Sequence, residues 1–144
     1  MNTYERIIEI LLEAADIKGE RGEFLRISGG DRLQTRREMA AAEKGRETKV
    51  KNLKGVKNTD APDIKPGFGG LKKAVKLLKS NDRDKAARRR AFDLVKAGKD
   101  DPSIIRTSGK GKSKKRDLVA GNTRAMFRKA LGLPIKAHVY KAPK

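Results

Sequence analysis

The chain has 144 residues, of which 37 are Lys or Arg and 18 are Asp or Glu, so its formal net charge is +19 at pH 7. It contains no Cys, which excludes disulfides and every metal or catalytic site that needs a thiolate. Hydrophobic residues make up 36% and aromatic residues 4%, so the core can support one domain at most, and we expect part of the chain to stay unpacked.

The excess of positive charge predicts an anionic partner. Such a charge repels itself unless something neutralises it, and a polyphosphate is the natural counterpart because each contact releases condensed counterions. A soluble surface alone needs far less charge. Between a nucleic acid and a membrane surface we expect a nucleic acid. We expect no membrane span, because no apolar run approaches the required length of about 20 residues.

The first half of the chain predicts two helices and a linker. A helix is expected at residues 3–15, and the polar, Gly-rich stretch after it predicts no element. A second helix is expected at residues 32–44, with Asp31 as its N-cap and Gly45 as its end. Residues 45–70 are interrupted by Gly and Pro and are rich in Lys, so a flexible linker is expected. The first helix carries one apolar stripe of Tyr4, Ile7, Ile8, Leu11, Leu12 and Ala15.

The second half predicts two more helices and then a mixed segment. Helices are expected at residues 71–79 and 82–97, the second capped by Ser80 or Asn81 and ended by Gly98. The remaining elements are a strand at 103–107, a Gly/Ser/Lys loop at 108–115, a strand at 117–120, a helix at 122–131 and a half-buried strand at 135–140. The only His, His138, is expected on the exposed face of that last strand.

The predicted fold class is α+β, with a helical N-terminal part, a flexible linker and a small α+β C-terminal domain. Three segments are expected. They are a short amphipathic opening at residues 1–13, a basic helical or disordered region at residues 14–70, and the remaining helices with the small α+β domain at residues 71–144.

The first residues combine an amphipathic opening, with Tyr4 near its start, and a Leu-Leu-Glu tripeptide that ends at Glu13 before the small Ala14. This opening resembles the capsid-targeting tag of internal head proteins in T-even-type phages. The resemblance implies cleavage after Glu13 at a site formed by Leu11, Glu13 and Ala14. It also implies contact with phage head scaffold or capsid proteins, and a location in the virion interior and then the host cytoplasm. The alternative is a plain N-terminal helix that packs on the core.

A Gly-x-x-Arg sequence stands where a strand meets a helix, and it consists of Gly121, Asn122, Thr123 and Arg124. A Gly turn there frees backbone N–H groups at the positive end of the helix dipole, and Arg124 adds donors suited to phosphate. We therefore predict that these four residues bind a phosphate or a nucleotide. The alternative is a tight turn at Gly121, a simple cap at Asn122 and a solvated Arg124.

The order of strand, Gly-x-x-Arg, helix ending in Leu131-Gly132, and strand resembles the ParB/sulfiredoxin-like family over residues 101–141. The resemblance implies a small α+β domain and binding of a nucleotide at the Gly turn. Asn122 stands where such ParB proteins carry an acidic residue, which counts against metal-assisted hydrolysis. The absence of Cys excludes sulfiredoxin activity.

Two dense basic clusters are candidates for contact with nucleic acid. One lies on the predicted helix at residues 82–97 and the other in the loop at residues 108–115. That loop is no P-loop, because Arg106 occupies the position of the first glycine. Both clusters could instead be solvated surfaces. Their members are Lys85, Arg88, Arg89 and Arg90 in the helix, and Lys110, Lys112, Lys114, Lys115 and Arg116 in and just after the loop.

Together these patterns favour a basic phage head protein that binds duplex DNA without sequence preference. The alternative is a ParB-like nuclease or nucleotide-binding protein, and an RNA-binding protein is a third, weaker possibility. No catalytic residue, no metal site and no cofactor is predicted, and the lack of interleaved aromatic residues argues against stacking on single strands.

Overall fold

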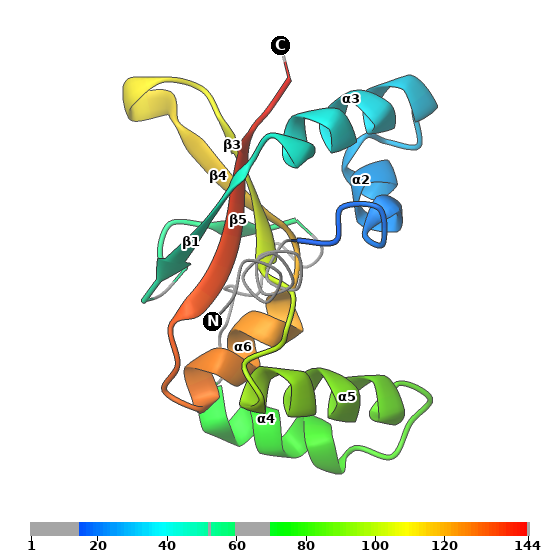
Figure 1. The fold of residues 1–144 in the computed structure, drawn as a ribbon, viewed down its shortest axis with the longest axis vertical. Helices are drawn as coiled ribbons and strands as arrows, with labels where there is room; N and C mark the ends of the chain where they lie inside the picture. The colour runs from blue at the N-terminus through cyan, green and yellow to red at the C-terminus, as the bar shows by residue number, and fades with distance from the viewer. Residues whose placement is uncertain (1–14, 52, 60–69, 144) are drawn as a thin grey trace, which may run out of the picture.

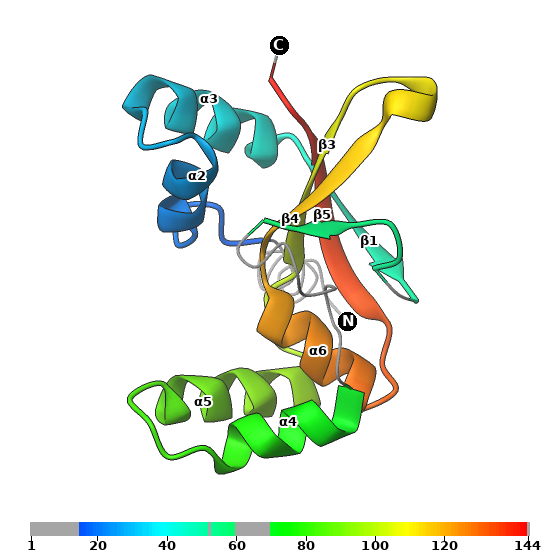
Figure 2. The same cartoon turned by 180° about the vertical axis from the view of Figure 1, so that it is seen from behind.

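The computed structural model describes residues 15–51, 53–59 and 70–143, shown from opposite sides in Figures 1 and 2. The predicted α+β class is confirmed. The expected processing site, and all but the last residue of the helix expected at residues 3–15, lie outside the described residues. The described elements are α2 (Arg21–Ile27), α3 (Arg32–Glu43), β1 (Arg46–Val50), β2 (Lys57–Asn58), α4 (Gly70–Lys79), α5 (Lys85–Lys96), β3 (Ser103–Ser108), the 3-10 turn η1 (Gly111–Ser113), β4 (Lys115–Ala120), α6 (Asn122–Ala130) and β5 (Ile135–Lys141).

The centre of the fold is a five-stranded mixed sheet in the order β1-β5-β3-β4-β2. Strands β3 and β4 form an antiparallel hairpin, while β5 runs parallel to β3 and antiparallel to β1. Helices α2 and α3 lie beside one end of the sheet, and α4, α5 and α6 form a separate layer at the other end (Figure 1). The hairpin tip therefore projects at the end of the molecule opposite α4 and α5.

The prediction of a linker at residues 45–70 is wrong for the part that the structure describes. Strand β1 pairs with β5 from Arg46 opposite Val139 to Val50 opposite Ile135, and β2 pairs with β4. The side chains of β1 are mostly exposed, so its sequence lacks the apolar alternation of a half-buried strand. Backbone hydrogen bonds along a sheet edge, which leave no trace in the sequence, hold this strand.

Helix α2 was not expected, and the sheet explains why it forms. Its Phe24 is fully buried and lies with its ring centroid 6.0 Å from that of Tyr140 on β5. Helix α3 confirms the predicted helix and its cap, because the Asp31 carboxylate accepts from the Gln34 N–H at 2.8 Å. Phe24 and Ala42 share one buried cluster with residues of β3, β4 and β5, so the core crosses the expected boundary at residues 70 and 71.

The last predicted strand is present as β5, but the prediction of an exposed polar face is wrong. Lys136, His138 and Tyr140 are all at least 91% buried. Nε2 of His138 lies 2.6 Å from the Ala42 carbonyl oxygen on α3, and the Lys136 ammonium donates to the Gly98 carbonyl at 3.0 Å. Both faces of the strand are covered, and the covering elements come from distant parts of the chain.

The helices predicted at residues 71–79 and 82–97 are confirmed as α4 and α5, but the second begins three residues later than predicted. Helix α5 begins at Lys85 after Asp84, so neither Ser80 nor Asn81 caps it. Phe127 of α6 is fully buried and meets Phe92 of α5 edge-to-face at 5.3 Å. Several apolar side chains of the α4–α6 layer remain exposed, namely Leu71, Val75, Leu94 and Leu131. No helix within the described residues is both long and apolar enough to cross a membrane.

Candidate nucleic-acid and phosphate sites

The Gly turn between β4 and α6 forms where the sequence predicts it. Gly121 is the N-cap of α6 and has φ +93°, a left-handed conformation that glycine adopts without strain. The Ser103 hydroxyl donates to the Gly121 carbonyl at 2.8 Å. A Cβ at Gly121 would lie 2.7 Å from the same hydroxyl oxygen. Both the backbone conformation and the close approach of β3 therefore require glycine here.

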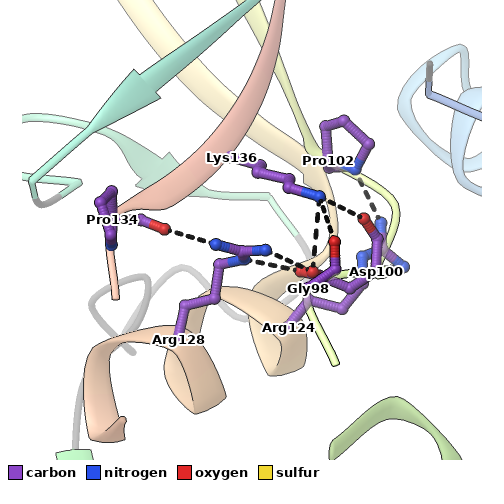
Figure 3. A network of polar contacts seen from close by, with 7 residues as sticks. All are labelled: Gly98, Asp100, Pro102, Arg124, Arg128, Pro134 and Lys136. Atoms are coloured by element: carbon purple, nitrogen blue, oxygen red, sulfur yellow. Dashed lines mark hydrogen bonds and ion pairs between the residues drawn. The ribbon is translucent and has the colours of Figure 1, made fainter. Parts of the chain in front are cut away.

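Arg124, the predicted phosphate ligand, is engaged by the protein itself. Its Nη1 lies 3.3 Å from the Glu20 carboxylate, and its Nη2 donates to the Pro102 carbonyl at 3.2 Å. Figure 3 shows Arg124 beside Pro102. The guanidinium thus ties α6 to the segment before β3 and to the turn before α2. The alternative of a solvated Arg124 does not describe this arrangement either.

A cavity of about 550 Å³ opens against this turn. Residues 121–124 line it together with Arg90 and four carboxylates, those of Glu20, Glu23, Asp100 and Asp101. Partial burial raises the pKa of Asp101, while Arg124 opposes that shift and the nearby Asp16 and Asp100 add to it. The cavity therefore combines a helix N-terminus with clustered negative charge, and a phosphate entering it would meet carboxylates.

Beside this cavity lies a buried polar network that ends at Asp100 (Figure 3). Asp100 is 1% exposed and receives two hydrogen bonds from Arg128, from Nε at 2.8 Å and from Nη2 at 2.5 Å. Arg128 also donates to the Pro134 carbonyl at 2.9 Å, and the Lys136 ammonium lies 3.8 Å from Asp100. Arg128 and Lys136 are therefore paired inside the fold and are not available to a ligand.

The basic cluster predicted on α5 is divided among several environments. Arg88 donates to the Leu77 carbonyl at 3.0 Å and pairs with Asp82 at 2.9 Å. The hydrogen bond from Arg88 to the Asp82 carboxylate lowers the pKa of Asp82. Arg88 therefore closes the loop between α4 and α5. Arg89 pairs with Asp93 at 3.5 Å, Arg90 lines the cavity at the Gly turn, and Lys85 is exposed.

The second predicted cluster lies on the projecting tip of the β3–β4 hairpin. The tip is an ordered turn, because the 3-10 turn η1 occupies it and the Ser113 hydroxyl donates to the Lys110 carbonyl at 2.7 Å. Arg116 donates to the Lys54 carbonyl at 3.0 Å and so braces the base of the hairpin. Four exposed lysines have no ion pair with any described residue, namely Lys110, Lys112, Lys114 and Lys115.

A second hollow, of about 1000 Å³, lies between α3 and this hairpin, and we call it the basic groove. None of the described Asp or Glu residues lines it. One of its basic residues, Lys114, belongs to a cluster that the sequence predicts, and the others come from α3 and its end, from β1 and from β5. The basic residues of the groove are Arg37, Lys44, Arg46, Lys114 and Lys141.

The described residues contain no group of three or more His, Asp or Glu side chains arranged to hold a metal ion. Comparison with known proteins finds no matching family model, no matching curated protein and no matching solved structure.

Proposed function

We propose that this chain binds duplex DNA without sequence preference. The observation that carries the proposal is the hairpin tip, where Lys110, Lys112, Lys114 and Lys115 are exposed and unpaired among the described residues. Holding like charges together on a rigid turn is unfavourable unless an anion neutralises them. A DNA backbone does so and releases its condensed counterions.

The chemistry of the tip favours contact with phosphates over recognition of bases. Lysine ammonium groups are point charges, whereas base recognition relies chiefly on paired donors and acceptors of Arg, Asn or Gln. Within residues 108–115 there is no such side chain and no aromatic ring for stacking on a single strand. Binding is therefore expected to be independent of sequence and steeply dependent on salt.

A titration of random-sequence duplex DNA between 50 and 200 mM salt tests this proposal. Six to ten phosphate contacts would lower the affinity by about 10³- to 10⁵-fold over that range. Replacing the four hairpin lysines by Gln should lower the salt slope by about 0.9 for each phosphate that is no longer neutralised. The matched control replaces four exposed lysines of α4 at the far end of the molecule, namely Lys72, Lys73, Lys76 and Lys79. An affinity that does not change with salt would contradict the proposal.

We also propose that the protein travels in a phage head. The support is the sequence of residues 1–14, which carries the tag-like opening and the predicted processing site and lies outside the described residues. Residues 1–13 hold three Glu and one Arg, a net charge of −2, so the chain without them would carry +21. Mass spectrometry of mature particles should find a chain that begins at Ala14, and finding Met1 to Glu13 intact would contradict this assignment.

Binding of a nucleotide at the Gly turn is a second candidate function, in line with the ParB/sulfiredoxin-like resemblance. The cavity of about 550 Å³ against residues 121–124 favours it. Its four carboxylates and the Arg124–Glu20 pair oppose it, because an anionic ligand would have to displace that pair. Calorimetric titration with nucleoside triphosphates tests binding there, and incubation with plasmid DNA and a divalent metal tests a nuclease.

A further inference from the structure

We infer that the basic groove binds the sugar–phosphate backbone of one strand of a DNA duplex, an inference that rests on the proposed function and gives it a site. The hairpin by itself supplies only a projecting tip. The groove continues from that tip across the end of the sheet to α3, because Lys114 belongs to both surfaces.

The geometry of the groove presents cations from three sides. Arg37 and Lys44 come from α3 and its end, Arg46 and Lys141 from the paired strands β1 and β5, and Lys114 from the hairpin. Strands β1 and β5 are hydrogen-bonded neighbours, so the floor is rigid. On the α3 side the other lining residues include Ala40 and Ala41, whose small side chains let a polymer backbone approach the helix closely.

The charge of the groove is not balanced from within the fold. None of its five basic side chains forms an ion pair with a described residue. Glu43 and Glu47 neighbour lining residues in sequence but do not line the groove themselves. Glu38 is 2% exposed, and its carboxylate accepts from Arg106 at 2.8 Å and from the Tyr140 hydroxyl at 2.7 Å. The nearby negative charge is thus directed into the core.

The hydrogen bond between Glu38 and Tyr140 also bears on which part of a nucleic acid the groove can bind. Among the described residues, Tyr140 is the only aromatic residue that lines the groove, and it is 2% exposed with its hydroxyl bound to Glu38. Among the described residues that line the groove, no ring is therefore free to stack on an unpaired base. The exposed Thr48 offers a hydroxyl donor beside Arg46, a group that commonly contacts phosphate oxygens. The lining therefore suits the backbone of a duplex, whose bases stay paired.

The test compares two triple variants of the full chain on the same random-sequence duplex. The groove variant carries Arg37→Gln, Arg46→Gln and Lys141→Gln, and the control carries Lys72→Gln, Lys73→Gln and Lys76→Gln on α4. Both remove three exposed charges, so their thermal unfolding should match that of the wild type. At 0.1 M salt the groove variant should bind on the order of 100-fold more weakly, with a salt slope lower by about 2 to 3. The control should stay within about threefold, because its lysines make no phosphate contact.

The outcomes separate this inference from the proposed function. If the wild type binds DNA and both variants lose affinity equally, binding is spread over the whole basic surface and the groove is not the site. If the wild type does not bind at all, the proposed function fails. A single-stranded oligonucleotide of equal length should bind more weakly than the duplex. Equal binding, with the same loss in the groove variant, would overturn the assignment to a duplex.

Discussion

The hairpin tip and the Gly turn hold their basic side chains in different surroundings, although the sequence of each predicts binding of phosphate. Both combine glycine with basic residues, and both were expected to bind phosphate. At the hairpin the lysines extend into solvent without partners among the described residues. At the turn the guanidinium of Arg124 is held by Glu20 and by the Pro102 carbonyl, and further carboxylates line the cavity.

The difference lies in where the acidic residues of the chain are placed. Glu20, Asp100 and Asp101 converge on the region around α6, so the cations there stabilise the fold. The hairpin and the basic groove receive no such partners from the described residues, so their cations remain available to a ligand. Net charge alone, at +19, does not distinguish a cation that binds a partner from one that supports the core.

Removing the carboxylate of Asp100 should have the largest effect on the α6 side of this comparison. The Asp100→Ala change leaves Arg128 and Lys136 buried without their counter-charge. Breaking a buried pair in this way costs about 3 to 5 kcal/mol of unfolding free energy. Urea denaturation measures the loss. A change below about 1 kcal/mol, typical of an exposed pair, would mean that the pairing of Arg128 and Lys136 with Asp100 does not stabilise the fold.

Replacing Gly121 by Ala should destabilise the chain by about 2 to 3 kcal/mol, because a Cβ at positive φ is strained and must also displace the Ser103 hydroxyl. Gly111 on the hairpin tip is the matched control, since it also has positive φ but its Cβ would meet nothing within 4 Å. Thermal unfolding of Gly121→Ala and Gly111→Ala measures the contrast. Equal losses would show that the packing against Ser103 contributes nothing.

The Arg88→Ala change tests whether a cation of the α5 cluster is structural. It removes the hydrogen bond to the Leu77 carbonyl and the pair with Asp82, at a cost of about 1 to 2 kcal/mol. DNA affinity should stay within about twofold, because a cation that makes no phosphate contact adds nothing to counterion release. Lys85→Ala is the control for stability, with an expected change within about 0.5 kcal/mol. A large loss of DNA affinity in Arg88→Ala at unchanged stability would move the interface to α5.

The smallest expected effect is a pH-dependent gain in folding stability when Asp101 is replaced by Asn. Because its pKa is raised in the folded state, the folded chain holds this proton more tightly, and that stabilisation disappears as the pH rises through the folded pKa. Asp101→Asn resembles the protonated form at every pH. The free energy of unfolding of this variant should equal that of the wild type in acid. At pH 7 it should be higher by about 0.3 kcal/mol, because solvent screens this group. Unfolding midpoints measured at pH 3 and pH 7 check the sign.

Local signals in the sequence located most elements of the second half. The helices α4 and α6, the strands β3, β4 and β5, and the Gly121 turn all follow from periodicity and backbone chemistry. Helix α2 and strand β1 did not follow, because α2 is short and β1 is a polar edge strand. Each is held by a distant partner, α2 through Phe24 on Tyr140 and β1 through its pairing with β5.

By itself the sequence determined the α+β class, the excess of positive charge and the turn residues, because these depend on composition and on neighbours within a few positions. Only the tertiary structure decided which cations are free. Arg124 and Lys110 have the same charge in the sequence, yet one is paired with a carboxylate 104 residues away and the other projects from a hairpin. The basic groove likewise exists only because β1 pairs with β5 beside α3. Coulomb energy depends on distance in space, which the spacing of residues along a chain does not reveal.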